Sequence, residues 1–249
     1  MPRGRLYLIP VPLGEMAASD VLPASVCARA QELRYFVAEN ARSARAFLKS
    51  LPLRHPVHAI EIHELNAHTP AASLPLLLAP ALAGDDLGLL SEAGCPAVAD
   101  PGAALVALAH REAVRVVPMV GPSSLLLALM ASGLCGQNFA FQGYLPSRAA
   151  QRLQRLRELE ALSRRQRQTQ IFIEAPYRNR QLLESLLSAC ASDTQLCIAS
   201  DLTRDSELIL TRHIGEWQVQ TLPDLHRRPT VFLLLAQSVG RACGVPGSL

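Results

Sequence analysis

The sequence has few aromatic and few charged residues, and the low share of charged residues argues against a disordered chain. Phe, Trp and Tyr make up 4% of its 249 residues, and Asp, Glu, Lys and Arg make up 18%. With 49% hydrophobic residues, the chain buries enough apolar surface to offset the entropy lost on ordering, so it is not disordered. We expect a compact chain whose core is built mainly of Leu, Ala and Val.

Metal and disulfide patterns are also missing. The six cysteines form no CxxC pair and no metal-ligand spacing, and they lie scattered in apolar stretches as buried free thiols do; they are Cys27, Cys95, Cys135, Cys190, Cys197 and Cys243. The amino terminus leads into a strand without the hydrophobic core of a signal peptide. We therefore predict a cytoplasmic protein that needs no metal.

One stretch, residues 116–134, is apolar enough to raise the question of a membrane span. Pro118, Gly121 and Pro122 interrupt it near its start, and the sequence has no second candidate span to re-satisfy the broken backbone. We interpret the stretch as a buried strand, a sharp turn and a buried helix, and expect no membrane association.

Lysine is almost absent, with Lys49 as the single example, and arginine supplies the remaining basic residues. The net charge is +3 and the isoelectric point is about 8.6. This mild basicity is compatible with a nucleic-acid partner and equally with an ordinary soluble enzyme.

The first half of the sequence alternates between strand and helix patterns. Strands are predicted at 6–11, 35–38, 58–62, 87–91 and 115–119, with helices at 24–33, 42–50, 72–82 and 103–111. The strands are continuous apolar runs, as parallel strands buried on both faces are. A Gly-Pro-Ser-Ser turn at 121–124 then separates the two halves.

The second half is richer in strands, and its connections allow antiparallel pairing. Strands are predicted near 139–141, 170–173, 195–199, 207–211 and 230–236, with helices at 125–131, 148–167 and 179–189. The fold class is therefore α/β with two domains. The domain at 1–120 has a mostly parallel sheet, and the domain at 121–249 has a mixed one.

Three loops follow predicted strands, which is where ligands bind in open α/β sheets. The first is the Pro/Gly-rich segment 9–15, which matches neither GxGxxG nor a P-loop. The second, 91–102, holds small residues and two prolines, so its backbone can approach a ligand closely while staying rigid. The third is 120–124, where a strand meets a helix N-terminus whose amides and hydroxyls can hold polar groups.

Taken together, these segments resemble the tetrapyrrole methylase family, and within it the branch that 2′-O-methylates a cytidine of small-subunit ribosomal RNA. That branch reads SDAGTPGISDPG where this chain has SEAGCPAVADPG, and PGPSA where this chain has VGPSS. The likeness includes LYLIPVPLGE, AENARSARAFL, ASGL, FQGYLP, IEAPYR and ASDLTR, and so runs in order through almost the whole chain.

The resemblance implies a homodimeric S-adenosylmethionine-dependent methyltransferase that binds its cofactor in the cleft between two domains. The family's cofactor positions fall on Pro12, Ala93, Gly94, Cys95, Val98, Ser123, Ser124, Ile173, Glu174, Pro229 and Thr230. We place substrate contacts at Glu39, Arg42 and Arg178. The apolar surplus of the chain independently favours a homodimer, because part of it would cover a subunit interface.

The chain departs from the RNA-methylating branch at three points. It has Glu-Asn-Ala-Arg at 39–42 where the branch has EDTR, Glu92 where Asp is usual, and Cys95 where Thr is usual. We also expect it to lack the extra C-terminal domain of some RNA-modifying members. These departures bear on the substrate more than on the cofactor.

No catalytic residue is singled out by the sequence. Methyl transfer to a hydroxyl is helped by a base, for which the candidates are Glu39, His63, Glu92, Asp100 and Glu174, each of which also suits a structural ion pair or cap. The segment 148–167 places Leu153, Leu156, Leu159 and Leu162 on one stripe, surrounded by Arg152, Arg155, Arg157, Arg164, Arg165 and Arg167. Such arginines either face solvent or bind RNA phosphates.

Three functions therefore remain open at this point. The first is methylation of a ribose 2′-hydroxyl in ribosomal RNA or a related acceptor. The second is methylation of a tetrapyrrole or other small heterocycle. The third is a non-catalytic family member that binds RNA or a protein.

Overall fold

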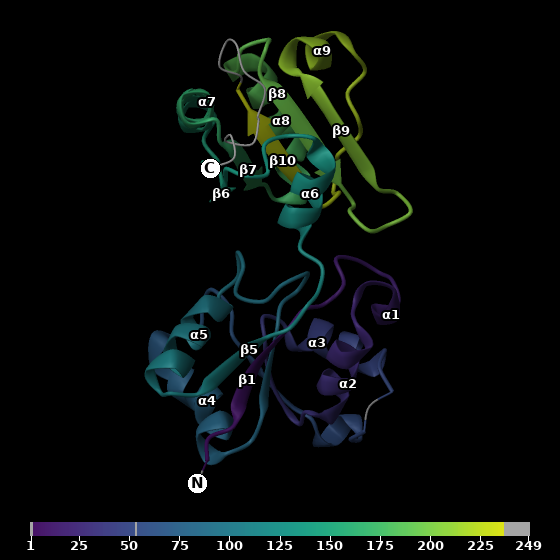
Figure 1. Ribbon diagram of the computed structural model, residues 1–249, viewed down its shortest axis with the longest axis vertical. Helices are drawn as coiled ribbons and strands as arrows, with labels where there is room; N and C mark the ends of the chain where they lie inside the picture. Colours follow the sequence, from purple (N-terminus) through teal and green to yellow (C-terminus); the bar gives the residue numbers. More distant parts are fainter. Residues whose placement is uncertain (1, 53, 237–249) are drawn as a thin grey trace, which may run out of the picture. The chain divides into compact units, whose positions relative to one another are not determined.

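The structure is a computed structural model that describes residues 2–52 and 54–236. The chain divides into two compact units, residues 1–123 and 124–249 (Figure 1). Each unit has its own sheet and its own hydrophobic core.

The first unit is built on a five-stranded sheet in which every pairing is parallel, with strand order β3-β2-β4-β1-β5. The strands are β1 (Arg5–Ile9), β2 (Tyr35–Ala38), β3 (Glu61–Glu64), β4 (Leu87–Leu90) and β5 (Arg115–Pro118). The helices are α1 (Ala18–Val21), α2 (Ala24–Glu32), α3 (Ala41–Lys49), α4 (Leu74–Ala83) and α5 (Gly102–Arg111), with 3₁₀ turns at Val57–Ala59 and Ala71–Ser73.

Helices cover both faces of this sheet, because alternate strand residues point to opposite sides. On one face Ile9 and Phe36 pack with Val26 of α2 and Leu48 of α3. On the other face the neighbouring strand residues pack against α4 and α5. The parallel arrangement brings the carboxyl ends of all five strands to one edge of the sheet, and the loops predicted to bind ligands begin there.

The second unit holds a mixed sheet with strand order β6-β7-β10-β8-β9. Only β6 and β7 pair in parallel, and the other three pairings are antiparallel. The strands are β6 (Phe139–Tyr144), β7 (Thr169–Ile173), β8 (Gln195–Ser200), β9 (Leu208–His213) and β10 (Thr230–Leu235). The helices are α6 (Ser124–Ser132), α7 (Ala149–Gln166), α8 (Asn179–Ala189) and α9 (Ile214–Val219), with a 3₁₀ turn at Pro176–Arg178.

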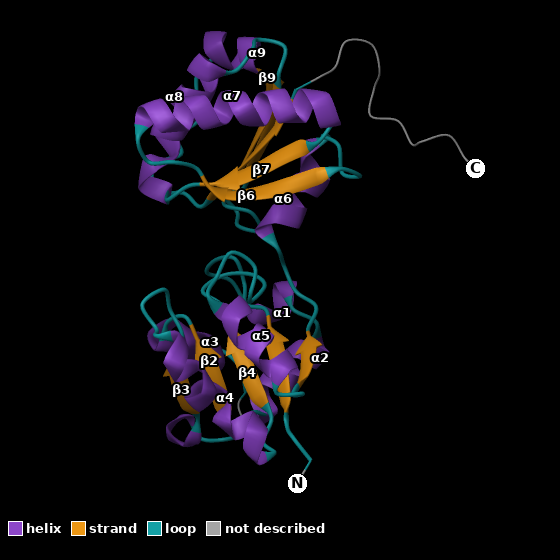
Figure 2. Cartoon of the chain, turned by 90° about the vertical axis from the view of Figure 1, so that its left-hand side faces the viewer, coloured by secondary structure: helices purple, strands orange, loops and turns teal. Residues whose placement is uncertain are grey.

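Helices α7 and α8 lie side by side on one face of the second sheet, and α6 lies on the other (Figure 2). Phe172 and Phe232 stack within the core on the α7–α8 face, with ring centroids 6.1 Å apart. The buried Trp217 of α9 closes this core, and its indole N–H donates to the carbonyl oxygen of Leu196 at 3.1 Å. That bond satisfies the polar atom of the ring, so the largest side chain of the unit is buried without an unpaired donor.

The two-domain α/β fold is confirmed, with a parallel first sheet and a mixed second one. Most predicted elements lie within one or two residues of the observed ones. Two strands differ by more. β3 was predicted at 58–62 and lies at Glu61–Glu64, because a 3₁₀ turn occupies the preceding residues. β6 was predicted near 139–141 and runs from Phe139 to Tyr144. The short helices α1 and α9 were not predicted.

The apolar stripe predicted on α7 is displaced. Its buried residues are Arg152, Leu156, Leu159 and Ser163, which follow the 3.6-residue helical period, whereas Leu153 and Leu162 are only half-buried. Arg152 donates to Ser185 Oγ and to the carbonyl oxygen of Ser147, both at 2.9 Å. The expectation that Arg152 faces solvent or phosphate is therefore wrong.

The long apolar stretch is a strand, a turn and a helix, as predicted, and among the described residues no helix is long and apolar enough to cross a membrane. Cys27, Cys95, Cys190 and Cys197 are free thiols. Cys135 is buried, and Cys243 lies outside the described residues.

Candidate functional site

The three loops expected to bind the cofactor meet at the carboxyl edge of the first sheet. Val11 and Gly94 exchange backbone hydrogen bonds of 3.0 and 3.1 Å, which join the loop after β1 to the loop after β4. The Cys95 thiol donates to the carbonyl oxygen of Pro122 at 3.4 Å, which joins the second loop to the third. Segments more than 80 residues apart in the sequence thus form one backbone surface in the first unit.

Gly94 lies at the centre of this surface. Its φ of +71° is in the left-handed region, which residues other than glycine rarely adopt. A Cβ atom there would lie 3.1 Å from both Leu13 Cδ2 and the carbonyl oxygen of Pro122. Glycine at this buried position therefore lets the second loop pack closely against Leu13 of the first loop and Pro122 of the third.

Asp100 holds the second loop in shape. One of its carboxylate oxygens accepts from the backbone N–H groups of Ala97 at 2.8 Å and Gly102 at 2.7 Å. Ala97 and Ala99 have positive φ angles of 64° and 62°, which cost energy for alanine and persist only where the surroundings fix them. Within the loop Ala93 and Val98 are exposed, and Cys95 is half-buried.

Three carboxylates gather at the same edge. Glu39, just after β2, is half-buried, and its pKa is raised above the ordinary value by burial and by the negative charges of Glu92 and Asp100. Burial also raises the pKa of Asp100, although its two backbone hydrogen bonds act against the rise. Glu92 accepts from Ser43 Oγ at 3.0 Å. Asp100 holds the second loop through its hydrogen bonds, and Glu92 is bonded to Ser43. Glu39 has a raised pKa and takes part in neither of these interactions.

The altered 39–42 segment keeps its local structure. The Asn40 side chain caps α3 by accepting from the backbone N–H of Arg42 at 2.8 Å, and Asn is as good a cap as the Asp usual in this position. The Ala41 N–H donates to Glu64 Oε1 at 2.9 Å. Arg42 is exposed in the first turn of α3, and His63 is exposed on the edge strand β3.

In the second unit, four predicted cofactor residues share one edge of the sheet. Ile173 ends β7 and pairs with Val231, so it lies beside Thr230 at the start of the antiparallel β10. Glu174 and Thr230 are buried, and Pro229 is exposed. Ser124 begins α6, and Ser123 is the last residue of the first unit.

Glu174 is a buried carboxylate with a single cationic partner. Its Oε1 accepts from the backbone N–H of Ala175 at 2.7 Å and from Arg178 at 2.6 and 3.0 Å. Its Oε2 is buried and has no partner among the described residues. An acceptor in this state fits a ligand that brings a hydroxyl or amino donor, as the ribose and adenine of a nucleoside cofactor do.

Sequence reasoning missed the network that fixes this edge. Asp201 Oδ2 accepts from Arg228 Nε at 2.7 Å and from Ser206 Oγ at 2.9 Å, and Arg228 also donates to the carbonyl oxygen of Ser206. The Asn179 amide donates to Thr230 Oγ1 at 3.2 Å. The signal was present in the Ser-Asp-Leu-Thr-Arg segment at 200–204, a polar run after a buried strand.

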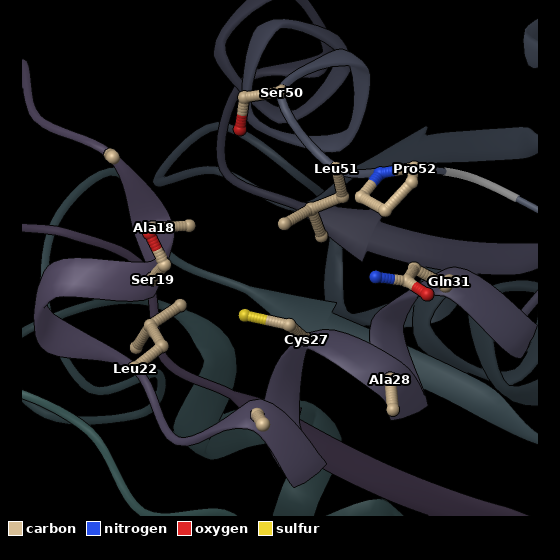
Figure 3. A pocket seen from close by; sticks show the side chains of 11 residues that line it. Ala18, Ser19, Leu22, Cys27, Ala28, Gln31, Ser50, Leu51 and Pro52 are labelled. Carbon is tan, nitrogen blue, oxygen red and sulfur yellow. The ribbon is translucent and has the colours of Figure 1, made fainter.

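The first unit also contains a cavity of about 540 Å³ between α1, α2 and the end of α3. Figure 3 shows the Cys27 thiol between Leu22 and Leu51 in this cavity. Its walls carry no charged side chain, and no predicted site residue lines it. Among the described residues, no group of three or more His, Cys, Asp or Glu side chains is arranged to hold a metal ion.

Comparison with known proteins identifies relatives along nearly the whole chain. This chain is 32% identical over 238 residues to ribosomal RNA small subunit methyltransferase I of Xylella fastidiosa. The match covers 94% of this chain and 81% of the relative. The protein of the same name from Escherichia coli O157:H7 is 29% identical over 240 residues, covering 94% and 78%. No protein-family model matches the chain.

Solved structures share the fold. The methyltransferase CobJ matches with a TM-score of 0.62 and 17% identity, covering 96% of this chain and 97% of that one. A uroporphyrin-III C-methyltransferase from Thermus thermophilus, complexed with S-adenosylhomocysteine, matches with a TM-score of 0.57 and 18% identity, covering 93% and 97%.

Proposed function

We propose that this chain, which belongs to the ribosomal RNA small subunit methyltransferase I branch of the tetrapyrrole methylase family, methylates a ribose 2′-hydroxyl of small-subunit ribosomal RNA. The protein is an S-adenosylmethionine-dependent methyltransferase. The observation that carries the proposal is the junction of three loops through Val11–Gly94 and Cys95–Pro122.

The residues of the first unit suit the methyl donor. The cofactor supplies a methyl group already activated on a positively charged sulfur, so the protein has to bind and orient rather than activate. Backbone groups of Pro12, Gly94 and Cys95 would hold it, with Ala93, Val98 and Ser123 at the border of the cradle. The carboxylates of Glu39, Glu92 and Asp100 provide a negative environment that favours a cation.

In the second unit we assign cofactor contacts to Ile173, Glu174, Pro229 and Thr230, and to Ser124 at the start of α6. The unpartnered Glu174 Oε2 supports this assignment, because it is an acceptor that needs a donor. Arg178 fixes the Glu174 carboxylate through its ion pair. We therefore assign Arg178 a positioning role besides the substrate contact expected from the sequence.

Glu39 is our candidate for the general base. A 2′-hydroxyl loses its proton as the oxygen attacks the methyl group, and a carboxylate whose pKa is raised accepts that proton more readily than an ordinary one. Arg42, one turn further on α3, is exposed and can bind an adjacent phosphate.

We also propose that the protein is a cytoplasmic homodimer and needs no metal. Ribosomal RNA, the substrate named for its relatives, is found in the cytoplasm of bacteria. Methyl transfer from a sulfonium requires no Lewis acid, because the leaving group is neutral once the methyl group has moved.

The test is transfer of labelled methyl groups from S-adenosylmethionine in extracts of a strain that lacks the gene. The purified protein is incubated with fractionated RNA, small ribosomal subunits and small molecules. We expect label in small-subunit RNA, at a ribose that resists alkaline cleavage on its 3′ side. Label confined to a small heterocycle would replace the RNA substrate with the second function, and absence of any label would favour a non-catalytic binder.

A further inference from the structure

Tyr177 is a large aromatic side chain that the second unit leaves in solvent. It lies in the 3₁₀ turn Pro176–Arg178, directly after Glu174 and Ala175, and 66% of its surface is exposed. Few aromatic residues occur in this chain. Tyr177 is the most exposed of them, ahead of Tyr144 at 61% and Phe139 at 42%, and it lies three residues after Glu174 of the candidate site.

The ring of Tyr177 is held in place. The guanidinium carbon of Arg178 lies over it, 5.4 Å from the ring centroid. Arg178 is in turn fixed by two hydrogen bonds to the buried carboxylate of Glu174. Since the cation covers one face of the ring and the residue stays mostly exposed, the other face is open to a ligand.

The backbone of a segment with three basic residues, 226–228, is fixed next to the turn that carries this ring. The backbone N–H of Arg227 donates to the carbonyl oxygen of Pro176 at 3.2 Å. The Asn179 amide donates to the carbonyl oxygens of Leu225 and Arg228 at 3.2 and 2.7 Å. These bonds hold the 225–228 segment against the turn that carries Tyr177.

The side chains around the ring are exposed and mostly positive. His226 and Arg227 are exposed, and Arg180 lies one turn further along the chain than Tyr177. Arg180 and His226 line a cavity of about 550 Å³ on the same side of α8. Arg180 pairs only with Glu184 among the described residues, in an exposed ion pair that contributes little energy.

We propose that Tyr177 and Arg227 form a stacking platform for an unpaired nucleobase of the RNA, with the ring under the base and the guanidinium on the neighbouring phosphate. An exposed aromatic face beside cationic side chains is the combination with which proteins bind single-stranded RNA. The proposal rests on the proposed function and deepens it. It requires the substrate nucleotides next to the methylated ribose to be unstacked.

Position supports the assignment. Tyr177 follows Glu174 by three residues, and Arg227 precedes Thr230 by three, and both of those residues are assigned to the cofactor. A base held on Tyr177 would therefore lie within the second unit's share of the active site.

The test compares Tyr177→Leu with Tyr177→Phe. Leucine keeps an apolar side chain but has no π-face, whereas phenylalanine keeps the face and loses only the hydroxyl. Affinity for small-subunit ribosomal RNA is measured by filter binding at fixed salt, and cofactor affinity by calorimetry. We expect Tyr177→Leu to weaken RNA binding roughly five- to a hundredfold, and Tyr177→Phe to bind like the wild type, with cofactor affinity unchanged in both.

Arg227→Gln tests the second half of the platform. It should lower the slope of log affinity against log salt by about 0.7 to 0.9, the contribution of one phosphate contact. Tyr177→Leu should leave that slope unchanged, because stacking releases no counterions. The two variants thus distinguish the contribution of stacking on Tyr177 from that of the Arg227 charge to RNA affinity.

Each outcome has a distinct meaning. If the wild-type protein methylates RNA and Tyr177→Leu binds RNA equally well, the platform is overturned and the proposed function stands. If the wild-type protein transfers no methyl group to RNA, the proposed function fails, and the platform with it. A change of molecular mass in Tyr177→Leu would show that the ring is a subunit contact, which also overturns the proposal.

Discussion

Gly94 shows how a single backbone position can decide whether a ligand is bound. Its left-handed φ and the two atoms 3.1 Å from an added Cβ make it a position at which any side chain is both strained and crowded. Gly133 has nearly the same φ, +70°, with nothing within 4 Å of an added Cβ. The two glycines differ in their surroundings and not in their backbone conformation.

We expect Gly94→Leu to abolish binding of S-adenosylmethionine, which in the wild type should be of roughly micromolar strength, about −8 kcal/mol. The side chain would fill the cradle formed by the three loops. Titration calorimetry measures the affinity. Gly133→Leu carries the same backbone strain in open space and should retain binding, so retained affinity in Gly94→Leu would place the cofactor elsewhere.

Glu39 gives a prediction that links rate, pH and stability. If Glu39 is the general base, Glu39→Gln should slow methyl transfer at saturating cofactor by about 10²- to 10⁴-fold. Because burial and two negative neighbours disfavour the ionised carboxylate, its charge costs folding energy above its raised pKa. The variant should therefore melt at a higher temperature than the wild type at neutral pH, and the difference should vanish in acid.

The wild-type rate should rise with pH through the raised pKa of Glu39 and then level off, because only the ionised carboxylate accepts a proton. Glu61→Gln, an exposed carboxylate at the other end of the neighbouring strand, is the matched control and should alter neither rate nor melting temperature. A slow Glu39→Gln enzyme with an unchanged pH profile would assign the base to another group.

At the scale of elements, α7 separates its arginines into two kinds. Arg152 is buried and hydrogen-bonded, and Arg155 and Arg164 are engaged with Glu158 and Asp193. Arg157 and Arg165 are exposed and form no ion pair within the part of the chain that the structure describes. With Arg164 they line a surface hollow of about 390 Å³.

We expect the double variant Arg157→Gln, Arg165→Gln to weaken RNA binding and to lower its salt slope by about 1.4 to 1.8, the contribution of two phosphates. Cofactor affinity should not change. Filter binding over a range of salt concentrations measures the slope. Arg34→Gln with Arg111→Gln, two exposed arginines of the first unit, removes the same charge and should leave the slope nearly unaltered.

Arg152 should behave differently from its neighbours. Arg152→Leu leaves the buried hydroxyl of Ser185 and the carbonyl of Ser147 without their donor, so it should reduce the free energy of unfolding by about 1 to 3 kcal/mol. Denaturant titration measures the loss. Weakened RNA binding in a fully stable Arg152→Leu protein would contradict the buried role.

The sequence predicted the elements better than the roles of their side chains. Strands such as β4, buried along its full length, are read directly from an apolar run, whereas α1 and α9 are too short to show a helical period. Arg152 was predicted to face solvent or RNA because its side chain is charged. Positions 152, 156, 159 and 163 follow the 3.6-residue helical period, and the structure shows that they form the buried face of α7. The polar run at 200–204 marks Asp201, but its partner Arg228 lies 27 residues further along the chain, and no local pattern contains that pairing.

For the whole molecule, we expect a homodimer. Helix α6 is apolar on every side, yet Leu126 and Met130 are 51% and 79% exposed. Such side chains are typical of subunit interfaces. Light scattering at micromolar concentration should give twice the chain mass, and the pair Leu126→Glu, Met130→Glu should shift it toward the monomer. Val219→Glu, at an equally exposed residue on α9, should not.

An enzyme that keeps a thiol next to a methylating agent risks alkylating itself. Cys95 stands in the proposed cofactor cradle, and its sulfur donates to the carbonyl oxygen of Pro122. Burial raises its pKa, so at neutral pH the sulfur is a thiol and not the thiolate that attacks carbon. With the cofactor bound as we propose, the burial of Cys95 would therefore make it a poor nucleophile toward the methyl group that lies beside it.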